Sequence, residues 1–176
     1  MTVQSVDFVD RDQYFRLRAL GPGPAGNRWE SVQLAWGLTS TDEYNRPLRR
    51  SAVNSIGSDF LVLLDDCRTR LEPFIGSDGE FLPADLDGRG VWIYRSTTYV
   101  DAIDLSRSHM KSETRFRRGD RMIVVASRLV DAQVYVFTAM PLLGTFFSER
   151  ARDSLLATGL FDTIEFRRPS AIEVID

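Results

Sequence analysis

The stretch GTFFSERARDSLLATGLFDTIEF, Gly144–Phe166, constrains the fold more than any other part of the chain, because it predicts strand, helix and strand in succession. Ser148 has the chemistry of a helix N-cap, since its hydroxyl can accept a hydrogen bond from an unpaired N–H of the first turn. Glu149 complements the positive end of the helix dipole. The pattern therefore predicts a short helix, Ser148–Thr158, that follows an extended segment.

Apolar residues lie on one face of this helix. Ala151, Leu155 and Leu156 fall at spacings of four and five, and Gly159 is placed for the left-handed residue that commonly follows a helix end. A further strand, TIEF, is expected to end at Phe166. We expect Leu155, Leu156 and Phe166 to belong to the core.

Short apolar runs of buried-strand length, such as FLVLL and MIVVA, recur along the rest of the chain. Loops rich in Gly and Pro separate several of them. These runs predict strands at Tyr14–Leu20, Ser31–Leu38, Asp59–Leu64, Glu80–Leu86 and Gly90–Ser96, and a hairpin formed by Asp120–Val130 with Ala132–Met140.

Two prolines qualify this pattern. DDCRTRLEPF, Asp65–Phe74, predicts a short helix capped by one of its two leading aspartates, and Pro73 should end the helix or distort its last turn. Pro83 cannot donate to a central ladder, so its strand is expected at an edge of the sheet. The segment Tyr44–Ser58 has no clear period and predicts an irregular connection.

The elements together predict an α+β fold with a mixed, mostly antiparallel sheet and a few short helices. A chain of 176 residues is typical of one domain. We therefore expect one globular domain over residues 1–176, with the weakest pattern in residues 1–58.

Charge and cysteine content narrow the function classes. The net charge of −3 and the pI of 5.3 argue against general nucleic-acid binding, which usually needs a basic face, and suit a basic partner. The single cysteine, Cys67, allows no intrachain disulfide. No secretory leader or membrane-length apolar run is visible, so we expect a cytoplasmic protein.

Three side chains are candidates for chemistry. Ser148 could be a nucleophile, but its surroundings lack the G-x-S-x-G elbow, so the cap is the favoured interpretation. Cys67 lies where a helix dipole could lower its pKa, yet two aspartates precede it, and a buried structural thiol is favoured. The only histidine, His109, lies in the polar segment SRSHMKSE.

Metal ligands are sparse. With one cysteine and one histidine, the chain does not have the Cys and His ligands that a structural zinc site needs. Asp101 and Asp104, with Asp85 or Asp87, could form a carboxylate site for magnesium, although solvated carboxylates are the commoner arrangement. We therefore expect neither a metal nor a cofactor.

Two basic runs, Arg46–Arg50 and Lys111–Arg121, could contact phosphates, with Phe116 stacking on a base. Acidic residues interrupt the second run, and the chain is acidic overall. Solvated loops are the favoured interpretation of both runs.

Two motifs together resemble the myxobacterial-type immunity proteins of bacterial polymorphic toxin systems. The middle motif is VDAIDLSRS, with matching positions Val100, Asp101, Ala102, Ile103, Asp104, Leu105 and Ser108. The tail motif matches at Phe147–Arg150, Leu155, Leu156, Thr158–Leu160 and Phe166. The resemblance covers residues 59–168 and implies a cytoplasmic α+β protein that binds and neutralises a cognate toxin without catalytic residues.

Two hypotheses follow. The first is a non-catalytic immunity protein with a basic toxin as partner, for which Tyr99, Asp101 and Asp104 are the expected contact residues. The neighbouring aromatics Trp92 and Tyr94 share one side of a strand and are favoured as core. The second is a small hydrolase or nuclease that uses Asp101, Asp104 and His109, with an arginine such as Arg121. It requires these groups to converge in one cavity.

Overall fold

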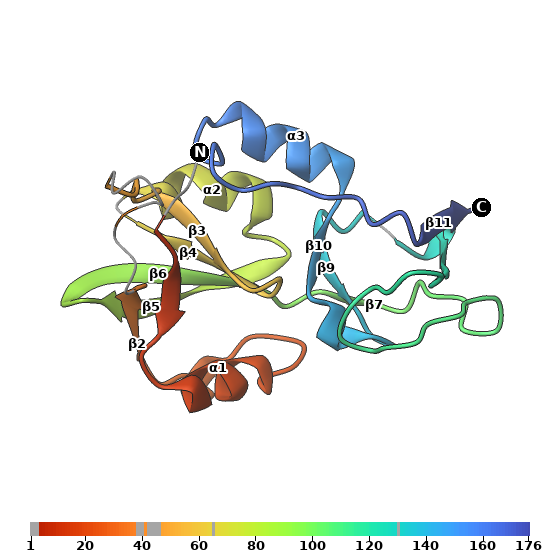
Figure 1. Ribbon diagram of the computed structural model, residues 1–176, viewed down its shortest axis with the longest axis horizontal. Coiled ribbons are helices and arrows are strands. Elements are labelled where there is room, and N and C mark those ends of the chain that lie inside the picture. The colour runs from red at the N-terminus through yellow and green to blue at the C-terminus, as the bar shows by residue number, and fades with distance from the viewer. Residues whose placement is uncertain (1–3, 38–40, 42–46, 65, 130) are drawn as a thin grey trace.

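A six-stranded mixed sheet in the order β1-β2-β5-β6-β4-β3 forms the larger part of the protein (Figure 1). The computed structural model describes residues 4–37, 41, 47–64, 66–129 and 131–176. The pairings are antiparallel except between β2 and β5, which run parallel. The strands of this sheet are β1 (Val6–Phe8), β2 (Val32–Trp36), β3 (Val53–Ile56), β4 (Phe60–Leu63), β5 (Gly79–Leu86) and β6 (Arg89–Ser96).

Helices cover both faces of this sheet. Helix α1 (Arg11–Arg18) lies on one face, and α2 (Cys67–Ile75) and α3 (Glu149–Ala157) lie on the other (Figure 1). Side chains of β4 therefore alternate between two apolar clusters, with Phe60 on the α1 side and Leu61 on the α2 and α3 side. Burial on both faces explains why the whole run FLVL is apolar.

Two smaller sheets complete the fold. Strand β9 (Val134–Phe137) lies between β7 (Tyr99–Val100) and β10 (Thr145–Phe147), and β8 (Met122–Val125) pairs in parallel with β11 (Ile172–Ile175). A third apolar cluster fills this half. The backbone N–H of Thr145 donates to the Ser58 carbonyl at 2.8 Å and ties β10 to the large sheet. Short 3₁₀ turns occur at η1 (Gly26–Arg28), η2 (Ala126–Arg128) and η3 (Pro141–Leu143).

The α+β fold class is confirmed, with mostly antiparallel pairing and short helices. Helix α3 has the predicted ends: Ser148 caps it, and Gly159 takes a positive φ of 71° beyond its last turn. Leu155 is fully buried as predicted, but the prediction for Leu156 is wrong, since its side chain is 47% exposed. Leu156 lies about 100° around the helix from Leu155 and so faces solvent.

The predicted strand Tyr14–Leu20 is wrong, because the segment belongs to helix α1. Asp10 caps the helix by accepting a hydrogen bond from the Asp12 N–H at 2.9 Å. Arginines occupy the last turn, where they complement the dipole, and Leu17 buries the inner face. The cap and this charge order outweigh the imperfect alternation of YFRLRAL.

The predicted hairpin of Asp120–Val130 with Ala132–Met140 is also wrong. After β8 the chain enters the 3₁₀ turn η2, and β9 pairs with β7 and β10 instead. The partner of β8 is β11, a strand that the sequence did not predict. Val130 itself lies outside the described residues.

The prediction that the Pro83 strand is an edge strand is wrong, since β5 lies between β2 and β6. The parallel ladder with β2 begins only at Ala84, directly after the proline. On the side of β5 that pairs with β2, the Pro83 carbonyl accepts a hydrogen bond from Trp29 Nε1 at 3.2 Å. A missing N–H at this position therefore removes no bond from the ladder.

The predicted helix of this region is present as α2. Pro73 lies in its last turn and does not end it, since the helix continues to Ile75, and Leu71 and Ile75 are buried in the core. Asp66 is its N-cap residue without a side-chain cap bond, and Asp65 lies outside the described residues. The expected irregular connection contains β3, and TIEF forms no strand.

The other strand predictions hold, although Leu38 lies outside the described residues. Phe166 is half-buried against Phe147, with ring centroids 5.3 Å apart. Tyr94 is buried and Trp92 half-buried, both on the α2 and α3 side. Among the described residues, no helix combines the length and apolar character needed to cross a bilayer.

Candidate functional site

The two motifs that carry the family resemblance meet in one small sheet. The middle motif begins in β7 and the tail motif in β10, and both strands pair with β9. Val100 of the middle motif is paired with Phe137, and Phe147 of the tail motif is paired with Val134. Segments far apart in sequence thus form one structural unit.

The middle motif is mostly structural. Ala102 and Ile103 are buried. Asp104 closes a turn, because its carboxylate accepts hydrogen bonds from the Ser106 hydroxyl at 2.6 Å and from the backbone N–H of Ser106 and Arg107. The bond from the Ser106 hydroxyl is the main cause that lowers the pKa of Asp104. The Ser108 hydroxyl accepts from the Ile123 N–H at 2.9 Å and fastens the segment to β8.

The three expected contact residues occupy different environments. Tyr99 is half-buried and lines a small cavity, Asp101 is exposed, and Asp104 is partly exposed within its turn. Leu105, which the sequence offers only as a matching position of the middle motif, is 60% exposed beside Asp104. The sequence signal for a contact role is an apolar residue set between Asp104 and the polar run SRS.

The alternative catalytic set does not converge on either cavity described below. Asp101, Asp104 and His109 line neither of them. His109 is exposed, and its backbone pairs with that of Arg121, whose side chain forms an ion pair with Glu173 at 2.8 Å.

The proposed magnesium ligands serve the turn between β5 and β6. Asp85 accepts a hydrogen bond from the Gly88 N–H at 2.8 Å, and Asp87 accepts from the Trp36 N–H at 3.4 Å. Across the described part of the chain, His, Cys, Asp and Glu side chains form no group of three suited to a metal.

Ser148 and Cys67 have structural surroundings. Ser148 Oγ accepts from the Ala151 N–H at 3.0 Å and donates to Gln133 Oε1 at 2.9 Å, which confirms the predicted cap. Cys67 is buried, with Sγ 3.6 Å from the Ala52 carbonyl. Burial, and then the Asp66 charge, raises the pKa of its thiol, so the thiol stays protonated near neutrality.

We expect Ser148→Ala to lower the free energy of unfolding by about 1 kcal/mol, because the first turn loses its cap. Urea unfolding measures this change. Ser127→Ala is the matched control, since it makes the same chemical change at a residue in the turn η2 that is not the N-cap of a helix. Equal midpoints for Ser148→Ala and the unaltered chain would contradict the cap.

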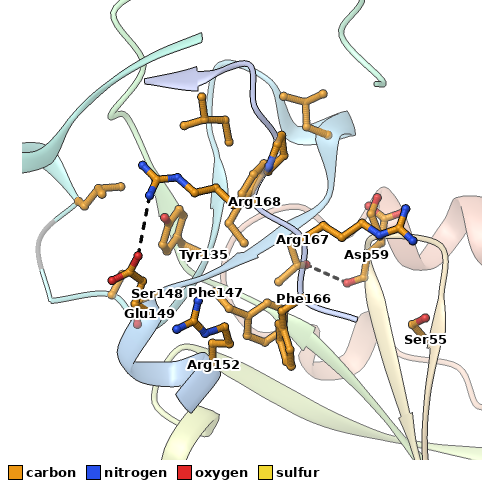
Figure 2. A pocket seen from close by; sticks show the side chains of 18 of the residues that line it. Ser55, Asp59, Tyr135, Phe147, Ser148, Glu149, Arg152, Phe166, Arg167 and Arg168 are labelled. Atoms are coloured by element: carbon orange, nitrogen blue, oxygen red, sulfur yellow. Dashed lines mark hydrogen bonds and ion pairs between the residues drawn. The ribbon is translucent and has the colours of Figure 1, made fainter. Parts of the chain in front are cut away.

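A cavity of about 1010 Å³ lies between the turn into β4, strands β9 and β10, and the start of α3, and the C-terminal segment 164–174 runs along it (Figure 2). Figure 2 shows Phe147 beside Phe166, with Arg167 and Arg168 on that segment. The aromatic residues that line this cavity are Phe60, Tyr94, Phe116, Tyr135, Phe146, Phe147 and Phe166.

Two ion pairs lie at the margin of this cavity. Arg168 lies 4.0 Å from Glu149, and Arg167 lies 2.6 Å from Glu165. An aromatic interior with paired ions at its margin suits the binding of apolar groups. The sequence signal for this lining is the density of phenylalanines in FFSER and TIEFRR, of which only Phe166 is predicted as core.

Residues of both basic runs form contacts within the protein. Arg49 pairs with Asp162 at 2.7 Å, and the Arg50 guanidinium lies 4.7 Å above the centre of the Trp36 ring. Arg46 lies outside the described residues. In the run Lys111–Arg121, the Asp120 carboxylate accepts hydrogen bonds from the backbone N–H groups of Lys111 and Arg117, which hold the loop in place.

Neither the models of known protein families nor the curated proteins that were searched contain a match to this chain.

Proposed function

We propose that this chain is a non-catalytic immunity-type protein that binds and neutralises a cognate bacterial toxin in the cytoplasm. The observation that supports this proposal best is the meeting of the two resemblance motifs on either side of β9. Each motif contributes one residue to this sheet, Val100 in β7 and Phe147 in β10, so the two motifs start on opposite sides of β9. The buried and turn-closing roles of the middle motif also fit a family that shares a scaffold rather than a reaction.

The middle motif also offers contact groups. Asp101 and Leu105 are both exposed on the segment that follows β7, so this segment offers a charge and an apolar anchor. Buried apolar anchors provide most of the affinity in protein interfaces, and charges speed the encounter. The acidic balance of the chain suits a basic toxin that acts on nucleic acid.

The test is co-expression in a bacterial host with the toxic domain encoded directly beside this chain's gene. The expected result is rescue of growth and co-elution of the two proteins. Continued growth arrest with both proteins present at equal levels would overturn the proposal. Hydrolysis of nucleic acid by the purified chain alone, lost in His109→Ala, would favour the enzymatic alternative.

We expect Asp101→Lys to slow association with a basic toxin several-fold at low salt and to flatten the salt dependence, with little change in folding. Asp104 is left intact because its carboxylate closes a turn. Stopped-flow or surface-plasmon measurements over a salt series give the rates.

Asp7→Lys is the matched control, since Asp7 is an exposed acid on the edge strand β1. It changes the net charge equally at another place. Equal slowing in both variants would assign the effect to net charge and remove this surface as the contact site.

A further inference from the structure

The large cavity beside β10 is an unusual space for a chain of 176 residues. Protein interiors are close-packed, and voids larger than a water molecule are few. This cavity holds about 1010 Å³, which lies near the upper end of the range for sites that bind small organic molecules. Aromatic rings from β4, β6, β9, β10 and the C-terminal segment line it (Figure 2). Contact between these rings and water is costly, so an apolar occupant would be stabilised here.

The rings that line the cavity are arranged in two geometries. Phe147 and Phe166 meet edge to face, with an angle of 82° between their planes. Tyr135 and Phe146 are nearly parallel, with ring centroids 6.1 Å apart and an angle of 13° between their planes. Aromatic pairs favour edge-to-face and offset parallel arrangements. The lining can therefore receive a further aromatic ring either on a face or at an edge.

The charged residues that line the cavity favour a neutral ligand. Its acids include Asp59, which lies 3.4 Å from Arg18, and Asp131, which is exposed to solvent. Each of its three arginines lies within 4.0 Å of a carboxylate, in the pairs Arg152–Asp153, Arg167–Glu165 and Arg168–Glu149. A charged ligand would lose hydration without gaining an uncompensated counter-charge from the described residues of the lining.

Tyr135 provides a polar group for such a ligand. Its side chain is 8% exposed, and its hydroxyl forms no hydrogen bond within the described part of the chain. The hydroxyl oxygen is not fully enclosed, so it stays within reach of a molecule that enters the cavity. Burial raises the pKa of Tyr135, so near neutrality the hydroxyl is protonated and can donate or accept a hydrogen bond.

The segment 165–168 gives such a molecule a route of entry. The backbone of these four residues forms no hydrogen bond with the described part of the chain. Before the segment, Thr163 Oγ1 donates to Ser51 Oγ at 2.7 Å, and after it β11 pairs with β8. Between these anchors lie the Phe166 ring contacts and exposed ion pairs, which add little stability. The segment can therefore move outward while both anchors stay in place.

We propose that the large cavity binds a neutral aromatic small molecule that carries one hydrogen-bonding group. The aromatic lining contacts the rings of this molecule, and the Tyr135 hydroxyl forms a hydrogen bond with its polar group. The paired charges at the margin disfavour a charged one. This binding is independent of the proposed toxin binding.

The test is fluorescence titration of the full chain with N-phenyl-1-naphthylamine, a neutral aromatic amine whose emission rises in apolar surroundings. The expected result is a saturable rise with a single probe bound per chain. The anionic probe 8-anilinonaphthalene-1-sulfonate has the same rings with an added sulfonate, and it should bind roughly tenfold more weakly or worse because its charge must be desolvated. No saturable rise, several probes bound per chain, or equal affinity for the sulfonate would rule out the proposal.

Ala132→Trp locates the binding site. Ala132 is half-buried and lines the large cavity, so an indole there occupies space that the probe needs, and the dissociation constant should rise about tenfold or more. Ala35→Trp is the matched control, since Ala35 is half-buried in β2 and lines neither this cavity nor a second one, of about 280 Å³, beside α1. Circular dichroism checks that both variants fold. Unchanged affinity in a folded Ala132→Trp would show that the probe binds elsewhere.

Tyr135→Phe tests the hydrogen bond and decides the matter if the indole is not tolerated. Loss of a bond between neutral groups should raise the dissociation constant about two- to tenfold. Tyr99→Phe is the matched control, since Tyr99 is half-buried at the second cavity and should leave the affinity unchanged. The same affinity in Tyr135→Phe as in Tyr99→Phe would contradict the assigned contact.

Discussion

Leu155→Ala should lower the free energy of unfolding by about 2–5 kcal/mol, the range for removing a fully buried leucine. Leu155 is 0% exposed and lies in the apolar cluster that joins α2 and α3 to the large sheet. Truncation removes apolar contact and leaves a cavity that the surrounding strands and helices fill only in part. Chemical denaturation with urea, read by circular dichroism, measures the change.

Leu156→Ala is the control for this prediction. It makes the same chemical change one position along the helix, where the side chain is 47% exposed, and should change stability by no more than about 0.5 kcal/mol. Similar losses for the two variants would mean that α3 is rotated about its axis relative to the described structure.

Arg95→Met should destabilise the protein by about 3–5 kcal/mol, the usual loss when one partner of a buried ion pair is removed. The variant leaves Glu80 without its cation, and it leaves the carbonyls of Gly21 and Gly23 without their donor. Methionine fills a similar volume, so the effect reports on charge and hydrogen bonding rather than on a cavity. Denaturant unfolding again gives the value.

Arg121→Met is the matched control. Arg121 pairs with Glu173 at 2.8 Å, close to the 2.7 Å of Arg95 with Glu80, but its side chain is 57% exposed. Exposed pairs contribute at most about 1 kcal/mol. A loss for Arg95→Met no larger than that for Arg121→Met would show that the buried pair is not a structural anchor.

Local signals were the part of the fold that the sequence could predict. The Ser148 cap and the Gly159 helix end each depend on a few adjacent residues, and both are present. Strand partners depend on distant residues. The pairing of β8 with β11 and the central place of Pro83 followed from contacts that no local pattern encodes.

The candidate site also depends on contacts between residues far apart in the chain. Tyr99 is predicted as a contact residue beside Asp101 and Asp104, and the pairing of β7 with β9, which no local pattern encodes, also places it at the small cavity. Both cavities are lined from segments far apart in the chain, so neither could be read from spacing. Exposure of Leu105 and Leu156 likewise depended on which neighbours covered them.

The parallel pairing of β8 with β11 also sets an order for biosynthesis. Met122 is opposite Ile172, so the β8 edge has no β11 partner until residues 172–175 have left the ribosome. Strand pairs that close long loops form slowly, and an unpaired apolar strand is prone to aggregation while it waits. The large sheet, whose strands all precede residue 97, can form first and act as a template for the half that follows.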